Sequence, residues 1–265
     1  MDKPMQGRVA LVAGGSRGIG AATAEAFAEA GASVVVGARD KAALEEVVGR
    51  IEDAGGQALA VVTDVSDVDS SRNLVEEAVG RFGRLDAAFN NATAGPLPAP
   101  LAEIDPAEFD EGIATNVRGT FLGMKFQIPA MLATGGGAVV NMASTAGVNG
   151  TANLAAYVAG KAGIIGLTKV AALDYADAGV RVNVVAPGAI LTHHLERAGA
   201  EAQRLAGLSA PMRRVGRAGE VADVVVWLCS EQSSYVTGTV VPVDGGRSAG
   251  DKPAQMYRQG QPMKG

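Results

Sequence analysis

The chain carries VALVAGGSRGIGAATAEAFAEA at residues 9–30. The apolar run at 9–13 predicts a buried strand, the following glycines predict a turn, and the alanine-rich remainder predicts a helix. A glycine turn between a strand and a helix is typical of a nucleotide site. Gly14 can supply the tight turn, Gly18 lets the backbone approach a diphosphate, and Gly20 lets the helix pack close to the strand. The helix N-terminus then offers free N–H groups to phosphate.

The rest of the chain repeats the same alternation of strand and helix. Apolar, β-branched runs occur at 9–13, 33–37, 58–62, 85–89, 137–142, 180–185 and 239–243. Segments with helical spacing separate them, which predicts a parallel sheet covered on both faces. We expect one α/β domain over residues 1–246, a doubly wound Rossmann-type sheet of about seven strands. Within it we expect a substrate lid at about 192–214, and after it a tail at 247–265.

A second feature is the pair Tyr157 and Lys161 in YVAGK, thirteen residues after Ser144. Residues at i and i+4 share one face of a helix, so an ammonium can favour the phenolate. This predicts a Tyr157 pKa below its usual value of about 10. A hydroxyl such as Ser144 can hold a substrate oxygen beside the phenol, as carbonyl reduction requires. Taken singly, Ser144 could merely cap a turn.

With these residues in place, the chain resembles the short-chain dehydrogenase/reductase family over nearly its whole length. Asn90-Asn91-Ala92 matches the family's NNAG segment, although Thr93 stands where glycine is usual and reshapes the lip of the pocket. The resemblance implies four catalytic residues, Asn116, Ser144, Tyr157 and Lys161. It also implies a cofactor site made of Gly14, Ser16, Arg17, Gly18, Ile19, Gly20, Arg39, Asp64, Val65, Asn91, Ala92, Tyr157, Lys161, Pro187, Gly188, Ile190 and Thr192.

The end of the second strand, Gly37-Ala38-Arg39-Asp40, bears on the choice of nicotinamide. A carboxylate at this point binds the ribose 2′-OH of NAD, whereas arginine accommodates a 2′-phosphate. By resemblance the NAD-selecting aspartate would fall at Ala38. Arg39 and Arg17 therefore favour NADP(H) over NAD(H). The alternative is that Arg39 and Asp40 are solvated loop charges, with Asp40 free to cap the next helix.

The expected activity is NADPH-dependent reduction of a small-molecule ketone to a secondary alcohol, or the reverse. Ser144 would donate a hydrogen bond to the carbonyl, Tyr157 would give it a proton, and Lys161 would hold the ribose hydroxyls. Asn116, through its helix and an ordered water, would pass protons to Lys161. Asn116 could instead satisfy only backbone groups.

Three other functions stay open. Much of the chain looks like the β-ketoacyl carrier-protein reductases, but Gly135-Gly136 and Asp177-Ala178 stand where those enzymes carry basic residues for docking an acidic carrier. The net charge of −5 does not help such docking either. A cofactor-sensing member without catalysis, or an epimerase, is the remaining alternative.

The substrate pocket should be walled by Thr93–Leu97, Thr145–Leu154 and Thr192–Arg214, which are mostly small or aliphatic. The adjacent His193 and His194 rarely aim at the same ion, so no metal site is expected. Arg213 and Arg214 could meet an anionic substrate or simply lie in water.

Composition fits a single-domain enzyme. The 265 residues are 48 % apolar and can bury one substantial core. A lone Cys229 excludes an internal disulfide, and the acidic charge without a basic cluster argues against nucleic acid. With no long apolar run or leader pattern, we expect no membrane partner and a cytoplasmic location. By resemblance, helices at roughly 107–132 and 154–178 form a four-helix interface in a homotetramer.

Overall fold

The structure, a computed structural model, describes residues 3–95 and 97–250. Its centre is a parallel sheet of seven strands in the order β3-β2-β1-β4-β5-β6-β9. The strands are β1 (Val9–Ala13), β2 (Ser33–Ala38), β3 (Gln57–Val62), β4 (Ala87–Asn90), β5 (Gly137–Met142), β6 (Val180–Pro187) and β9 (Val240–Val243). The order reverses between β1 and β4, so the predicted doubly wound sheet is confirmed.

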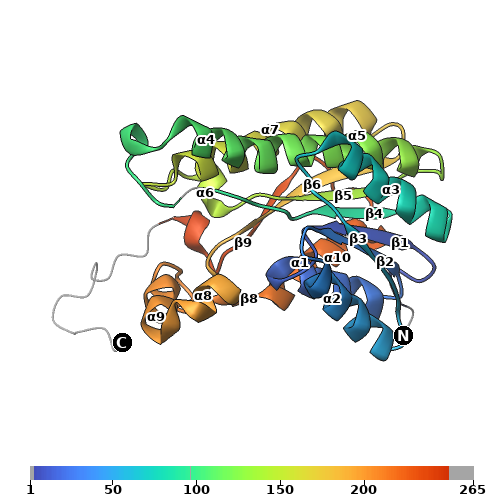
Figure 1. The fold of residues 1–265 in the computed structure, drawn as a ribbon, viewed down its shortest axis with the longest axis horizontal. Coiled ribbons are helices and arrows are strands. Elements are labelled where there is room, and N and C mark those ends of the chain that lie inside the picture. Colours follow the sequence, from blue (N-terminus) through green and yellow to red (C-terminus); the bar gives the residue numbers. More distant parts are fainter. Residues whose placement is uncertain (1–2, 96, 251–265) are drawn as a thin grey trace.

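Helices cover both faces of this sheet (Figure 1). One layer holds α1 (Gly18–Glu29), α2 (Lys41–Asp53) and α10 (Ala218–Cys229). The other holds α3 (Val68–Phe82), α4 (Pro106–Ile113), α5 (Gly119–Leu132) and α7 (Ala155–Tyr175). Shorter elements are α6 (Thr145–Val148), α8 (His193–Arg197), α9 (Gly199–Leu208), η1 (Leu101–Glu103), η3 (Glu231–Ser233) and η4 (Arg247–Ala249).

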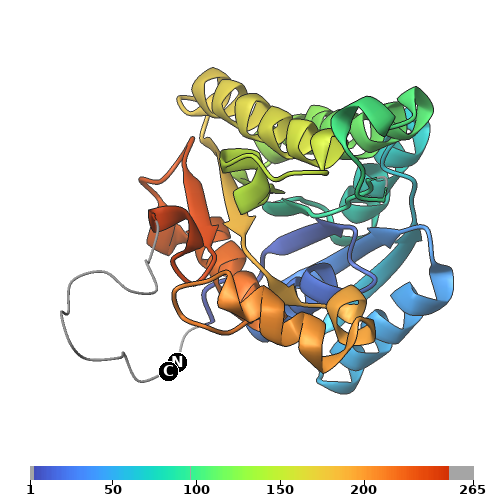
Figure 2. The ribbon, with the colours of Figure 1, turned by 90° about the vertical axis from the view of Figure 1, so that its left-hand side faces the viewer.

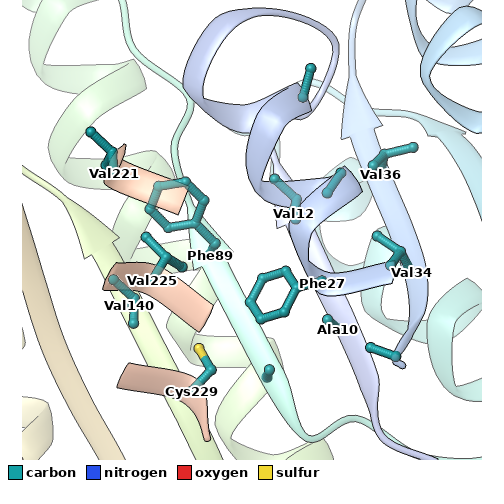
Figure 3. Close-up of a cluster of buried hydrophobic side chains, with 14 of the residues drawn as sticks. Ala10, Val12, Phe27, Val34, Val36, Phe89, Val140, Val221, Val225 and Cys229 are labelled. Carbon is teal, nitrogen blue, oxygen red and sulfur yellow. The ribbon is translucent and has the colours of Figure 1, made fainter. Parts of the chain in front are cut away.

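The sheet separates two hydrophobic cores. Successive side chains of β1 point to opposite faces, so Val12 packs with Phe27 of α1 in one core and Leu11 with Leu74 of α3 in the other. Figure 3 shows the first core, in which Phe27 and Phe89 are fully buried beside Val12 and α10. Because both faces of the central strands are buried, these strands are mostly apolar, and this produced the runs visible in the sequence.

Cys229 belongs to the first core (Figure 3), and burial raises the pKa of its thiol to about 12. It is therefore a packing residue.

Among the described residues, α7 is long and apolar enough to cross a membrane, judged by its length and composition alone. It packs against β6, α4 and α6, and it buries Lys161. These contacts are those of a helix within this fold.

Three helices begin with a capping aspartate, and α1 does not. Asp40, Asp67 and Asp105 each accept a hydrogen bond from a backbone N–H in the first turn of α2, α3 and α4. The capping role of Asp40, which the alternative interpretation of the Arg39-Asp40 pair had allowed, is thereby observed. Helix α1 follows Arg17 without a side-chain cap. Its first N–H groups thus lack the carboxylate that the three neighbouring helices carry.

The structure departs from the sequence-based expectation at two places. The helix expected at 107–132 consists of α4 and α5 joined by η2 (Ala114–Arg118), a π-helical turn. The segment expected to form a lid at 192–214 is also flanked by a small parallel ribbon of β7 (Ile190–Leu191) and β8 (Gly216–Arg217), with α8 and α9 between its strands. Two-residue strands carry no periodicity from which they could be predicted. Of the expected tail at 247–265, residues 251–265 lie outside the described part of the chain.

Candidate active site

The glycine loop after β1 is packed against the loop after β4. Gly14 has a φ of +82°, and a Cβ on it would lie 2.6 Å from the Ala92 nitrogen. A Cβ on Gly20 would overlap the Gly14 carbonyl oxygen. That oxygen also accepts a hydrogen bond of 2.7 Å from Asn91 Nδ2. Gly14 and Gly20 are therefore required for close packing, and Asn91 fixes the loop between them.

Gly18 is packed less tightly than Gly14 and Gly20. Its φ is +57°, and the nearest atom to a Cβ built there would be Thr192 Cγ2 at 3.4 Å. The loop and Thr192 thus border a groove at the uncapped N-terminus of α1. Backbone N–H groups at a helix N-terminus bind phosphate, and the absence of a side chain on Gly18 lets a diphosphate come close to the loop backbone. The residues present fit the expected cofactor.

One cavity of about 470 Å³ connects this groove with the predicted catalytic residues. In Figures 1 and 2, α7 lies on one side of the sheet's carboxyl end and the α8–α9 segment lies on the other. Predicted site residues that line the cavity are Arg17, Gly18, Ile19, Asn91, Ser144, Tyr157, Lys161, Pro187, Gly188, Ile190 and Thr192. Gly14, Ser16, Gly20, Arg39, Asp64, Val65, Ala92 and Asn116 do not line it. Thr93, His193 and Arg197 line it from the segments predicted to wall the substrate pocket, and Met142 and Ala143 line it without having been predicted.

Ser144 and Tyr157 lie near each other on the wall of this cavity. Ser144 follows the end of β5 by two residues as the N-cap of α6, where its Oγ accepts from the Ala146 N–H at 3.1 Å. Tyr157 lies in the first turn of α7. Burial raises the pKa of the Tyr157 phenol, and the neighbouring Ser144 hydroxyl opposes that rise only in part. The predicted lowering of the Tyr157 pKa is wrong for this structure, because burial outweighs the groups that would favour the phenolate.

Lys161 is 1 % exposed, one helical turn beyond Tyr157. Its Nζ donates to the Met142 carbonyl oxygen at 2.9 Å and lies 5.6 Å from the centre of the Tyr157 ring. Burial lowers the pKa of Lys161 to about 7. The sequence spacing predicted the pair correctly but not this burial, which makes the lysine itself titrate near neutrality.

Asn116 is completely buried in the π-helical turn η2. Its Nδ2 donates to the carbonyl oxygens of Gly112 and Ala94, at 2.8 and 2.5 Å. Its Oδ1 accepts a hydrogen bond of 2.9 Å from Thr93 Oγ1. The side-chain amide therefore clamps the loop after β4 onto the helix. The hydroxyl of Thr93, the residue at which the chain departs from the NNAG pattern, completes this clamp, and nothing in the sequence signalled that contact.

The outer end of the groove carries charges in close pairs. Arg17 Nη2 lies 2.5 Å from Asp40 Oδ2, so this guanidinium is held by a carboxylate. Hydrogen bonds from the side chain and backbone of Ser66 lower the pKa of Asp64, with a smaller contribution from the charge of Arg39. Val65 packs against Gly119 at the start of α5.

The two lid arginines considered for an anionic substrate have other partners. Arg214 binds both carboxylate oxygens of Glu220, at 2.7 and 2.9 Å. Arg213 donates to the Leu208 carbonyl oxygen at 2.9 Å. Neither arginine lines the active-site cavity. Both therefore bind other parts of the fold and not the anionic substrate that was considered for them.

Comparison with known proteins fits this geometry. A sequence profile described as enoyl-(acyl carrier protein) reductase matches residues 13–248. The A-factor type gamma-butyrolactone 1'-reductase (1S-forming) of Streptomyces virginiae is 42 % identical over 243 residues, which cover 90 % of this chain and 95 % of that protein. A short-chain type dehydrogenase/reductase from Mycobacterium marinum, known from its crystal structure, superposes with a TM-score of 0.88 at 35 % identity, covering 94 % of this chain and 99 % of that one. The chain belongs to the short-chain dehydrogenase/reductase family.

Within the short-chain dehydrogenase/reductase family, a cyclohexanol dehydrogenase of Acinetobacter sp. strain SE19 is also similar. It is 41 % identical, over 92 % of this chain and 96 % of that enzyme. This short-chain dehydrogenase/reductase is accordingly an NAD(P)-dependent oxidoreductase acting on CH–OH or C=O groups.

Proposed function

We propose that the protein is an NADPH-dependent reductase that converts a ketone of a small molecule into a secondary alcohol, or catalyses the reverse reaction. The observation that carries this proposal is that Ser144, Tyr157 and the buried Lys161 line one cavity together with Gly18 and Thr192, with Lys161 Nζ 5.6 Å from the centre of the Tyr157 ring. A positioned acid, an orienting hydroxyl and a cofactor groove are what carbonyl reduction needs.

When bound, the nicotinamide dinucleotide supplies or accepts a hydride. Ser144 donates a hydrogen bond to the substrate oxygen, and Tyr157 transfers the proton that this oxygen gains or loses. An ammonium has three N–H donors, and the Met142 carbonyl oxygen takes one of those of Lys161. The other donors are available for the ribose hydroxyls. Thr192 and the Pro187–Ile190 backbone hold the carboxamide.

The protonation states favour this division of roles. With its pKa raised by burial, Tyr157 keeps its proton at neutral pH and is ready to act as an acid. Lys161, with a pKa of about 7, gains a proton as the pH falls. A charged Lys161 beside Tyr157 stabilises the phenolate that remains after proton transfer. Asn116 acts as a positioning residue, since its amide holds the loop at the lip of the cavity.

Tyr157→Phe tests the catalytic proposal directly. NADPH oxidation would be followed against a panel of ketones, diketones and acyl thioesters, with wild-type protein and this variant side by side. We expect turnover to fall at least about 100-fold while the dissociation constant for NADPH changes little. Normal turnover by the variant would refute the role of Tyr157. Net NADPH consumption also separates a reductase from a cofactor sensor or an epimerase, neither of which consumes it.

The preference for NADPH rests on the end of β2. Ala38 provides no carboxylate for a ribose 2′-OH, and the exposed Arg39 follows it. Because Arg17 is paired with Asp40, we assign the 2′-phosphate chiefly to Arg39. Arg39→Asp should reverse the ratio of dissociation constants for NADPH and NADH. Lys41→Asp makes the same change of charge two residues away and should leave the ratio unchanged; the assignment fails if both variants behave alike.

The substrate we propose is a free, uncharged ketone or alcohol. In the segments predicted to wall the substrate pocket, Leu97, Val148, Leu205, Leu208 and Met212 are exposed apolar side chains. The names of the similar enzymes, a cyclohexanol dehydrogenase and a butyrolactone reductase, support compact cyclic substrates. A carrier-linked β-ketoacyl group is the second candidate, and faster turnover of acyl thioesters than of cyclic ketones in the panel would favour it.

A homotetramer is the assembly we propose. Phe121 on α5 and Val170 and Leu173 on α7 are large apolar side chains exposed in the single chain, Leu173 by 83 %. Such a surface on adjacent helices is typical of a subunit interface. Light scattering coupled to gel filtration should give four times the mass of the chain, and a monomeric mass would refute this part.

A further inference from the structure

Helix α8 of the lid contributes a basic side chain to the wall of the active-site cavity. Arg197, in the last position of α8, lines the cavity together with His193 one turn earlier. Arg17 and Lys161 line it from other elements, and no aspartate or glutamate among the described residues does so. The wall therefore carries basic groups without carboxylates, which favours an anionic ligand.

Arg197 differs from the other described arginines in its partners. On the neighbouring helix α9, Arg204 binds Glu201 at 2.7 and 2.8 Å, and the arginines at 213 and 214 are bound as described above. Within residues 3–95 and 97–250, Arg197 alone among the arginines has no hydrogen bond, ion pair, ring contact or charged neighbour. Its guanidinium is available to a ligand.

The glycine loop and the N-terminus of α1, which suit an anion, lie on the other side of the same groove. Helix α8 begins directly after Thr192, whose Cγ2 borders the position above Gly18. Arg197 ends this one-turn helix, and it lines the same cavity as Arg17 and Gly18 of the glycine loop. The uncapped N-terminus of α1 faces this groove as well. A phosphate on the loop would meet α1 from one side and α8 from the other.

We propose that Arg197 binds an oxyanion held in the cavity, and that the diphosphate of the dinucleotide is its source. This inference rests on the proposed function for its ligand, and it adds a contact from the lid to the cofactor. By it, α8 contributes a charge-assisted contact to the bound dinucleotide from the wall of the substrate pocket.

Calorimetric titration with ADP-ribose tests the contact without turnover. Removing one charge-assisted contact should raise the dissociation constant of Arg197→Gln about 10- to 100-fold. Arg197→Lys should recover part of the loss, because it keeps the charge but not the planar fork. The matched control is Arg204→Gln, which removes the same charge from the lid outside the cavity and should leave the affinity unchanged. Adenosine 2′-monophosphate, which lacks the diphosphate, should bind all four proteins equally.

Two further readouts separate the possible results. An unchanged affinity for ADP-ribose, with KM raised for a keto acid but not for a neutral ketone, would place the oxyanion on the substrate. No change in either measurement would overturn the proposal. Titration with inorganic pyrophosphate distinguishes failure of the anion site from failure of the proposed function. Loss of pyrophosphate binding in Arg197→Gln, in a protein that binds neither NADPH nor NADH, would refute the proposed function but keep the anion site.

Discussion

Replacing Lys161 by methionine should stabilise the fold while removing turnover. Lys161 is 1 % exposed and has the Met142 carbonyl oxygen as its hydrogen-bond partner, so its ammonium is poorly compensated for the water it has lost. Burial lowers its pKa from 10.5 to about 7, and at about 1.36 kcal/mol per pKa unit this corresponds to about 5 kcal/mol. Part of that gain is offset in the variant by loss of the hydrogen bond, about 1–3 kcal/mol.

The sign of the pH dependence is set by proton binding. Between pH 7 and 10.5 the unfolded chain holds a proton on Lys161 and the folded protein does not. The stability of the wild-type protein therefore rises with pH across this window. Lys161→Met has no such rise. We expect the variant to be about 2 kcal/mol more stable than wild type at pH 7, and the difference to shrink towards pH 10.

Equilibrium unfolding in urea, followed by circular dichroism at pH 7 and pH 10 and at a fixed protein concentration, measures this difference. Lys169→Met is the matched control, because Lys169 is exposed on the same helix. It should change stability little at either pH. A Lys161→Met variant that is less stable than wild type at pH 7, or a difference that stays constant with pH, would refute the reasoning.

Three further changes probe other parts of the site and core. Gly20→Ala places a methyl group against the glycine loop; overpacking should cost about 1–3 kcal/mol in urea unfolding and weaken NADPH binding measured by calorimetry. Thr93→Val removes the donor to Asn116 Oδ1 and leaves a buried oxygen unpaired, which should cost about 1–3 kcal/mol and lower kcat more than it raises KM. Burial would raise the pKa of Asp86, but hydrogen bonds from two arginines and a backbone N–H outweigh it and lower that pKa. Its contribution to stability is complete above the usual carboxyl pKa and is lost as the pH falls through the lower folded value. Asp86→Asn should therefore cost about 2 kcal/mol in urea at pH 7 and less at pH 3.

Each of these changes has a control. Gly80→Ala adds the same methyl group on α3, where no atom lies within 4 Å of the new Cβ, and should be neutral or stabilising. Thr93→Ser keeps the hydroxyl and should restore kcat; a Thr93→Val enzyme with wild-type kinetics would contradict the positioning role. An Asp86→Asn penalty of the same size at pH 3 and pH 7 would show that charge is not responsible.

The strands were predictable because both faces of the sheet are buried, so runs such as Val34–Val36 are apolar without interruption. The glycine loop was predictable because each glycine meets a separate steric demand of the turn. Spacing along a helix likewise predicted that Tyr157 and Lys161 share a face. It could not predict how deeply they are buried, and the Tyr157 pKa was wrong for that reason.

What the sequence could not predict depends on contacts between distant segments. Thr93 lies 23 residues from Asn116, and only the folded chain places its hydroxyl on that amide. Arg197 belongs to no sequence motif. It stands out only in the folded chain, where the arginines at 204, 213 and 214 have partners and Arg197 has none among the described residues. The ribbon of β7 and β8 joins residues 26 positions apart through two hydrogen-bonded residues on each side, too few for any pattern.

The turn at Ala114–Arg118 has a consequence for how the chain tolerates changes of length. A π-helical turn holds one residue more than an α-helical turn, so deleting Thr115 would let α4 run into α5 as one regular helix. That helix would gain ordinary hydrogen bonds, and α4 and α5 would keep their relative phase, because the wide turn is what absorbs the extra residue. The deletion would instead take Asn116 from its position against the Ala94 carbonyl oxygen. In this segment, the extra residue therefore serves the placement of one side chain and not the course of the helices.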